Sequence, residues 1–165
     1  MIDSKSITAG LGTLLIVAAE AAAGGADADE VAALIERTRP RTRVLGGLDT
    51  LENLKKGGRI GGAQALLGSL LSIKPILDLS SGVVEEAGKA RTRKKALEVL
   101  RDKVAAAGQV ERLTVTHGFA PDVEDMLELL APICPRDQIR VGHIGPVIGT
   151  HGGPRVMGLT WLAPA

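Results

Sequence analysis

Residues 51–60 read Leu-Glu-Asn-Leu-Lys-Lys-Gly-Gly-Arg-Ile, and residues 73–77 read Ile-Lys-Pro-Ile-Leu. The spacing of Leu51 and Leu54 predicts a short helix, and the glycine pair predicts its end, because a backbone without Cβ can turn sharply. Arg59 comes directly after this turn. We expect its guanidinium to point inward and clamp an anion through two hydrogen bonds; a solvated surface arginine is the alternative.

The sequence on both sides of this stretch changes irregularly between helical and extended patterns. We expect helices over residues 7–23, 27–39, 63–71, 92–107 and 121–130, and strands over residues 41–48, 73–79, 83–87, 113–116, 138–144 and 156–162. A turn joins the second and third strands into a hairpin, and a glycine-rich loop joins the last two. Without strict alternation or a repeat, this order predicts an α+β fold with a mixed, largely antiparallel sheet and packed helices.

The first part of the chain is expected to be a separate helical unit. Asp27 and Glu30 have the spacing of a capping box, which predicts the start of a second helix. The residues before the first helix look like the end of a strand. We therefore expect residues 1–45 to be a helical segment that belongs to a missing partner domain, and residues 46–165 to form the principal domain.

The apolar side chains are almost all aliphatic. Of 165 residues, 45% are hydrophobic, yet the chain has one Phe, one Trp and no Tyr. A pocket would therefore be aliphatic, which suits an alkyl ligand and disfavours single-stranded nucleic acid, whose binding depends on aromatic stacking. The formal net charge of +1 provides no overall field that would attract nucleic acid or a membrane surface.

Cysteine content and hydropathy predict the cellular compartment. Cys134 is the only cysteine, which excludes an intrachain disulfide and favours a reducing compartment. The apolar run over residues 7–23 is interrupted by Glu20 and dominated by small residues, so it predicts a packed helix and not a signal peptide or membrane span. We expect a cytoplasmic protein without integral membrane association.

The second candidate for ligand binding is the segment Gly149-Thr-His-Gly-Gly-Pro154. A histidine in a glycine-rich turn is little crowded and can donate to an anionic ligand, whereas an imidazole bonded to its own backbone is the alternative. His117 and His143 are expected to be structural. The histidines are far apart in sequence, so we predict no metal site, and no serine lies in a pattern typical of a catalytic nucleophile.

Two runs of the sequence are strongly basic. Residues 37–43 contain four arginines, and residues 89–95 contain five cationic side chains. Such runs are usually solvated, but they can bind nucleic acid or an acidic partner protein. The second run opens a predicted helix, where positive charge opposes the helix dipole. This conflict favours a functional role for Arg91.

Five short motifs follow one another along the chain: Asp3-Ser-Lys-Ser6, residues 51–60, Ile73-Lys-Pro-Ile-Leu77, Arg91-Thr-Arg-Lys-Lys95 and His151-Gly-Gly-Pro154. In order and spacing they resemble the DegV family of bacterial fatty-acid-binding proteins, over essentially the whole chain. Members of that family are considerably longer. The resemblance therefore implies that residues 1–45 are a helical remnant of the amino-terminal α/β lobe, and that residues 46–165 are a DegV-like carboxyl-terminal domain.

The resemblance implies a carrier that encloses a long-chain fatty acid in an aliphatic tunnel and presents its carboxylate to a fatty acid kinase. No residue would be catalytic, and the fatty acid would be a bound ligand, with no cofactor and no metal. Carried over by motif, the residues at the carboxylate end are Arg59 and His151, together with Gly58, Thr150 and Gly152 beside them.

The resemblance also implies contacts with other chains. Arg91 and Arg93 would lie on the surface that meets the kinase. Without the amino-terminal lobe, an apolar strip would face solvent, so we expect a homo-oligomer that forms through this surface. Arg155 stands where the family usually has glycine, and it would either crowd the carboxylate site or supply another cation.

The leading interpretation is thus a non-enzymatic lipid carrier. One alternative is a small phosphate-handling enzyme that uses Arg59 and His151 on a phosphoryl group, although neither a nucleophile nor a metal site accompanies them. The other alternative is an interaction module that uses the two basic runs, which the low aromatic content and near-neutral charge disfavour.

Overall fold

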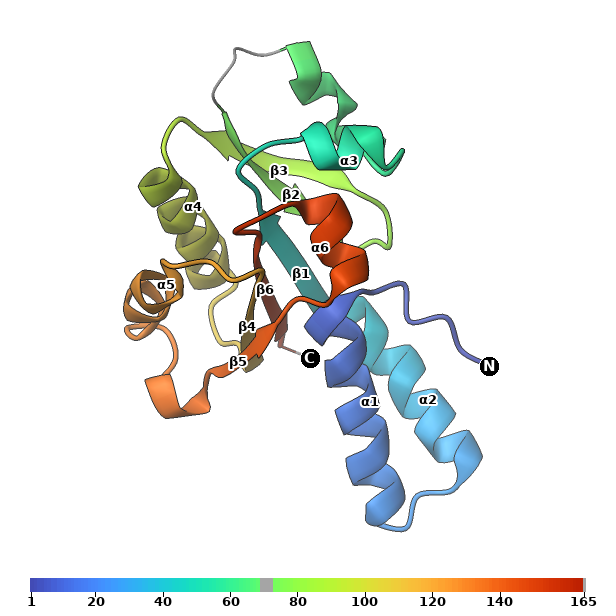
Figure 1. The fold of residues 1–165 in the computed structure, drawn as a ribbon. Helices are drawn as coiled ribbons and strands as arrows, with labels where there is room; N and C mark the ends of the chain where they lie inside the picture. Colours follow the sequence, from blue (N-terminus) through green and yellow to red (C-terminus); the bar gives the residue numbers. More distant parts are fainter. Residues whose placement is uncertain (69–72, 165) are drawn as a thin grey trace.

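The computed structural model describes residues 1–68 and 73–164. These residues form one six-stranded sheet with helices packed on it (Figure 1). The spatial order of the strands is β3-β2-β1-β6-β4-β5. Only β4 and β5 pair in parallel; the other neighbours are antiparallel. The predicted α+β fold with a mixed, largely antiparallel sheet is confirmed. The strands are β1 (Thr42–Gly47), β2 (Lys74–Asp78), β3 (Glu85–Ala90), β4 (Glu111–His117), β5 (Arg140–His143) and β6 (Met157–Leu162).

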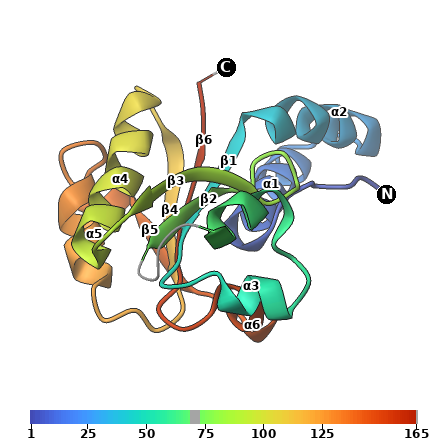
Figure 2. The same ribbon diagram turned by 90° about the horizontal axis from the view of Figure 1, so that it is seen from above.

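Helices lie on both sides of this sheet, as the view from above shows (Figure 2). One side carries α4 and α5, and the other carries α3, α6 and the start of α1. The helices are α1 (Thr8–Ala23), α2 (Ala28–Thr38), α3 (Glu52–Lys56), α4 (Arg93–Ala106), α5 (Val123–Leu130) and α6 (Pro146–Gly152), with short 3-10 segments η1 (Arg39–Arg41), η2 (Gly61–Gly68) and η3 (Arg136–Gln138).

The face covered by α4 and α5 holds the larger hydrophobic cluster. The side-chain oxygen of Thr92 caps α4 by accepting a hydrogen bond from the backbone N–H of Lys95. The expected inward stripe of α4 is confirmed, since Ala96, Leu97, Leu100 and Val104 are all buried. They pack with Met126, Leu127 and Leu130 of α5 and with apolar side chains of the central strands. We call this side the closed face.

The opposite face holds a smaller cluster and is incompletely covered. Its buried members come from the loop after β1, from α3, η2 and β2, and from the segments before and after α6: Leu48, Leu51, Leu54, Ala63, Leu66, Leu77, Ile144 and Val156. α3 and α6 pack against each other above this side of the sheet. We call it the open face, because the cavity described below lies on it.

The helical hairpin α1–α2 projects from one end of the sheet (Figure 1). Its capping box is confirmed: Asp27 accepts hydrogen bonds from two backbone N–H groups, and the Glu30 carboxylate accepts one from the N–H of Asp27. α1 packs against β1, β4 and β6, and Glu20 forms an ion pair with Arg112. The expected domain boundary at residue 45 lies within β1.

Several predicted elements differ from the structure in type or extent. The glycine-rich segment expected to be a loop contains the helix α6, because Pro146 suits the first turn of a helix, and the chain leaves the helix only at Gly153, whose φ is +79°. The expected helix over residues 63–71 is the 3-10 segment η2, with residues 69–71 outside the described part of the chain. The third strand, expected over residues 83–87, is shifted to Glu85–Ala90.

Candidate functional site

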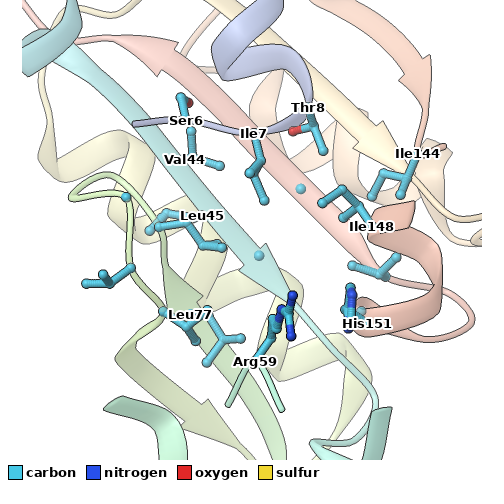
Figure 3. A pocket seen from close by; sticks show the side chains of 18 of the residues that line it. Ser6, Ile7, Thr8, Val44, Leu45, Arg59, Leu77, Ile144, Ile148 and His151 are labelled. Carbon is cyan, nitrogen blue, oxygen red and sulfur yellow. The ribbon is translucent and has the colours of Figure 1, made fainter. Parts of the chain in front are cut away.

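A cavity of about 620 Å³ lies on the open face. Its walls come from the segment before α1, from the turn after β2, from the loop after α3, and from α6 (Figure 3). Most of the lining side chains are aliphatic, among them Ile7, Val44, Leu77, Ile144 and Ile148. The volume and composition are typical of a site for an apolar small molecule.

The sheet forms the floor of this cavity, and two glycines of the central strands leave space above it. Gly46 of β1 and Gly158 of β6 are directly paired across the two central strands, and both line the cavity. A Cβ at Gly158 would lie 2.6 Å from the hydroxyl oxygen of Thr116, so a larger residue would not fit beside it. Glycine inside a strand typically marks a place where something approaches the backbone closely.

The turn that carries Arg59 is a Schellman motif at the end of α3. The N–H of Arg59 donates to the carbonyl of Leu54 at 2.9 Å, and the N–H of Gly58 donates to the carbonyl of Lys55 at 3.1 Å. Gly58 has a φ of +65°, as the motif requires. The helix end predicted from the glycine pair is therefore confirmed. Beyond it, the Arg59 side chain reaches the cavity lining.

Arg59 is exposed and keeps most of its hydrogen-bonding capacity. Its Nη1 donates to the carbonyl of Gly57 at 3.2 Å, and no ion pair involves Arg59 within residues 1–68 and 73–164. A guanidinium has five N–H donors, so several are available to a bound carboxylate or phosphate.

His151 lies on α6, at the same end of the cavity as Arg59 (Figure 3). Its ring packs on Gly57: a Cβ at that position would overlap Nδ1 of His151. Nδ1 is buried and has no hydrogen-bond partner in the described part of the chain. This leaves Nε2 as the nitrogen able to meet a ligand. A proton on Nε2 would make it a donor to an anion.

The three other residues predicted around the carboxylate divide into two groups. Gly152 is buried and lines the cavity. Gly58 and Thr150 do not belong to the lining; Gly58 shapes the turn before Arg59, and the Thr150 hydroxyl donates to the carbonyl of Pro146 at 2.8 Å. The structure therefore brings together Arg59, His151 and Gly152 at the cavity wall.

The candidate partner residues Arg91 and Arg93 lie in different environments. Arg91 is exposed. Arg93 is largely buried and forms a bidentate pair with Asp122, with its Nε donating to Oδ2 at 2.7 Å and its Nη2 to Oδ1 at 3.1 Å. Its Nη1 also lies 3.7 Å from Oδ1 of Asp49. Of the two arginines, Arg91 is therefore the more accessible.

Arg155 joins the same ionic cluster and not the cavity lining. Its Nε lies 3.6 Å from Asp49 Oδ2, and its Nη2 lies 3.7 Å from Asp122 Oδ2. The side chain neither lines the cavity nor adds a cation to it. Neither outcome expected for Arg155 at the carboxylate site is found, because its guanidinium lies beside Asp49 and Asp122.

The charges of this cluster determine the ionisation of Asp122. Burial acts to raise its pKa, but the hydrogen bonds and positive charge of Arg93, and the charge of Arg155, outweigh burial and hold the pKa below its ordinary value of 3.8. Asp122 is therefore ionised at neutral pH. The cluster connects α4 and α5 of the closed face with the loop between α6 and β6 of the open face.

The remaining candidate residues form no second reactive centre in the described chain. Burial, and then the charge of Asp137, raises the pKa of Cys134, so this buried thiol is a weak nucleophile. His117 and His143 face each other across β4 and β5, with ring centroids 4.7 Å apart. Over residues 1–68 and 73–164, no three His, Cys, Asp or Glu side chains gather as metal ligands, and no helix has the length and hydropathy to cross a membrane.

Comparison with known proteins agrees with the motifs. Residues 1–164 match the model of the family described as "Uncharacterised protein, DegV family". The chain belongs to the DegV family. A DegV domain-containing protein of Streptomyces coelicolor is 37% identical over 163 residues, which cover 96% of this chain and 58% of that protein. This DegV chain thus spans a little over half the length of such relatives.

Solved DegV structures share its fold. The structure titled "Fatty Acid Binding of a DegV family Protein from Thermus thermophilus" aligns with a TM-score of 0.86 and 38% identity, over 99% of this chain and 60% of that one. The fatty acid binding DegV family protein of Streptococcus agalactiae aligns with a TM-score of 0.89 and 30% identity, over 100% and 60% of the two chains.

Sequence reasoning missed several residues that build the site. The sequence predicts only that Gly57 ends a helix, yet the His151 ring packs on this glycine. The residues before the first helix are wrongly predicted as the end of a strand; they have no regular structure, and Asp3, Lys5, Ser6, Ile7 and Thr8 form a cavity wall. The glycine pair Gly46-Gly47 within a predicted strand was the available signal for a low cavity floor.

Proposed function

We propose that this chain binds a long-chain fatty acid in the cavity of the open face and acts as a carrier that performs no chemistry. The observation that carries the proposal is an aliphatic cavity with the guanidinium of Arg59 and the imidazole of His151 at the same end. The solved relatives titled as fatty-acid-binding proteins support this ligand class. The reducing cytoplasm is the compartment we propose, since the single cysteine is unpaired.

In this proposal the two ends of the ligand meet different chemistry. The carboxylate accepts hydrogen bonds from Arg59 and from Nε2 of His151, and charge-assisted bonds of this kind are among the strongest in proteins. The acyl chain lies on the glycine floor against aliphatic walls, where each buried methylene contributes about 0.8 kcal/mol. A long chain therefore contributes more affinity than the carboxylate, while the carboxylate fixes the orientation.

The proposed partner is a fatty acid kinase, which would receive the carboxylate end. This step rests on the family resemblance and on the exposure of Arg91 at the start of α4. Arg93, which pairs with Asp122, would contribute by fixing the beginning of α4. Arg91→Ala should weaken complex formation with the kinase while leaving fatty-acid affinity unchanged.

Binding can be tested by native mass spectrometry of the purified chain, lipid extraction, and titration with a fatty acid and its matching alcohol. Arg59→Ala should weaken binding of the acid about tenfold or more, because a hydrogen bond to a charged group contributes about 1.5–3 kcal/mol. The alcohol should lose far less. Lys56→Ala is the matched control, since Lys56 is an exposed cation of α3 outside the cavity lining.

One result would contradict the proposed role of Arg59, and another would contradict the function itself. Equal losses for the acid and the alcohol would show that Arg59 has only a structural role. Absence of any bound lipid, together with hydrolysis of a phosphate ester, would favour the phosphate-handling enzyme.

Association of the chain with itself also remains a prediction. Leu11 and Leu15 of α1 are exposed although the helix is apolar on most sides, and such surfaces favour contact with another apolar surface. We expect a dimer or larger species in sedimentation experiments. Leu15→Lys should then shift the distribution toward the monomer, whereas a clean monomer of the unmodified chain would refute the prediction.

A further inference from the structure

A second cavity lies beside the first on the open face. It has a volume of about 450 Å³ and is lined by the first residues of α1, by β4 and β5, and by the beginning of α6. Among residues 1–68 and 73–164, Thr8, Thr116 and Ile148 line both cavities. They therefore form the partition that separates the two spaces.

Ile148 is the one large apolar side chain in this partition. It lies on α6 three residues before His151, and residues three apart share one face of a helix. It is partly buried and packs on the hydrophobic cluster of the open face. Figure 3 shows it on the cavity wall near Ile144, between Thr8 and His151.

The other two partition residues are smaller and fixed in place. Thr116 is buried in the centre of the sheet, and its hydroxyl lies 3.5 Å from the carbonyl oxygen of Gly158. Thr8 is the first residue of α1, and its backbone has a φ of +48°. Ile148 is therefore the partition residue whose truncation would remove most of the wall between the two cavities.

The walls of the second cavity suit methylene groups. Small and aliphatic residues supply most of the lining, including Ala9, Val141, Gly142, Pro146 and Val147. Val141 and Val147 are 49% and 72% exposed, and Arg140 and His143 in the lining are also exposed, so this space is open to solvent. If the partition were removed, the two cavities would form one largely aliphatic site that extends over β4 and β5.

We propose that the second cavity is a side chamber of the ligand site and that Ile148 keeps the acyl chain out of it. The inference rests on the proposed function in one respect, namely that the first cavity holds an acyl chain. Ile148 then determines specificity: a straight chain of limited length fits beside it, whereas a longer chain or one bent by a cis double bond has no room beyond the partition.

The test is Ile148→Ala, titrated with saturated acids from decanoic to docosanoic acid. In the unmodified protein, each added methylene should strengthen binding about fourfold, which corresponds to about 0.8 kcal/mol, until the chain meets the partition and affinity levels off. In the variant, this point should move to chains at least two carbons longer. Oleic acid should also gain several-fold relative to stearic acid.

Val147→Ala is the matched control. Val147 is the preceding residue of the same helix, is 72% exposed, and lines only the second cavity. It enlarges that cavity without opening the partition, so the length at which affinity levels off should not move. Ile148→Val removes one carbon and should shift specificity in the same direction by less, which keeps the test available if the alanine variant does not fold.

An equal change in affinity for all acids, or an unmoved levelling-off point in Ile148→Ala, would overturn the partition. Xenon binding in crystals provides a reading that needs no fatty acid, because xenon occupies apolar cavities. A new xenon site in the space vacated by the Ile148 side chain is expected, and closure of that space would overturn the inference. If no fatty acid binds but this site appears, the proposed function fails while the joined cavities stand.

Discussion

Two neighbouring residues of β1 show how the faces of the sheet differ. A Cβ at Gly47 would lie 2.9 Å from Cδ1 of Leu100 on the closed face, closer than real contacts allow. A Cβ at Gly46 would meet Leu48 and Leu79 on the open face at 3.6 and 3.7 Å, an ordinary contact distance. Successive strand residues point to opposite faces, so a single strand can pack one face tightly and leave the other open.

This difference separates the residues that stabilise the fold from those that form the site. The closed face buries the larger hydrophobic cluster beneath α4 and α5. The open face contains a cavity of about 620 Å³, so the side chains that line it make fewer van der Waals contacts than side chains in a closed core. Stability and ligand binding should therefore respond to different substitutions.

The largest expected difference between the faces is in the effect of truncating leucines. Leu100 is fully buried on the closed face, and Leu100→Ala should lower the free energy of unfolding by about 3–5 kcal/mol. Leu77 is equally buried but lines the cavity, so it has fewer neighbours to lose, and Leu77→Ala should cost about 2 kcal/mol. Urea denaturation of both variants measures the difference. A larger loss for Leu77→Ala would contradict the division into a closed and an open face.

The ionic cluster that joins the two faces should have the next largest effect. Asp122→Asn leaves the largely buried Arg93 without its closest carboxylate, and should lower the free energy of unfolding by about 2 kcal/mol at neutral pH. The pKa of Asp122 lies below its ordinary value of 3.8 in the folded protein, so its contribution to stability is present above that value and is lost as pH falls through the folded pKa.

Denaturation at several pH values tests this assignment. The difference between the unmodified protein and Asp122→Asn should stay constant from neutral pH to about pH 5 and shrink below pH 4. Asp125→Asn is the control, because Asp125 lies in the first turn of α5 and forms no ion pair in the described part of the chain. A difference that persists in acid would show that Asp122 acts through packing and not through its charge.

The glycine pair of β1 allows the comparison to be made within one strand. Gly47→Ala forces the Leu100 side chain to move and should cost about 1–2 kcal/mol of stability, with little effect on the ligand. Gly46→Ala should change stability by less than about 0.5 kcal/mol but weaken fatty-acid binding several-fold, because the added methyl group stands on the cavity floor. An equal decrease in the free energy of unfolding for Gly46→Ala and Gly47→Ala would contradict the difference in packing between the two faces.

Local patterns predicted those parts of the molecule that neighbours in sequence determine. The capping box of α2, the inward stripe of α4 and the glycine stop of α3 all depend on residues within a few positions of one another, and each was predicted correctly. The helix α6 was missed because its glycines favour a loop by propensity. Packing against α3 stabilises it instead.

The candidate site was only partly predictable for the same reason. Arg59 and His151 were selected one by one from their local surroundings, but no local signal indicates that Gly57 contacts His151 across the fold. The pairs of Arg93 with Asp49 and Asp122 likewise join segments far apart in sequence, so the role of Arg93 in fixing α4 could not be inferred from its basic run. Topology brings these side chains together.

The smallest effects are expected at the glycine pair of the α3 stop, where adjacent residues again have different roles. Gly58 has a φ of +65° and open space around it, so Gly58→Ala should cost about 1 kcal/mol of stability by backbone strain alone. Gly57 has an ordinary φ of −80°, but its Cβ would overlap His151. Gly57→Ala should therefore displace the imidazole and weaken binding of a fatty acid a few-fold more than binding of the matching alcohol. Titration of both variants with the fatty acid and with the alcohol measures these losses of affinity. If instead Gly58→Ala weakened binding of the acid more than binding of the alcohol, the turn would control the carboxylate end of the cavity, and the packing of His151 would not.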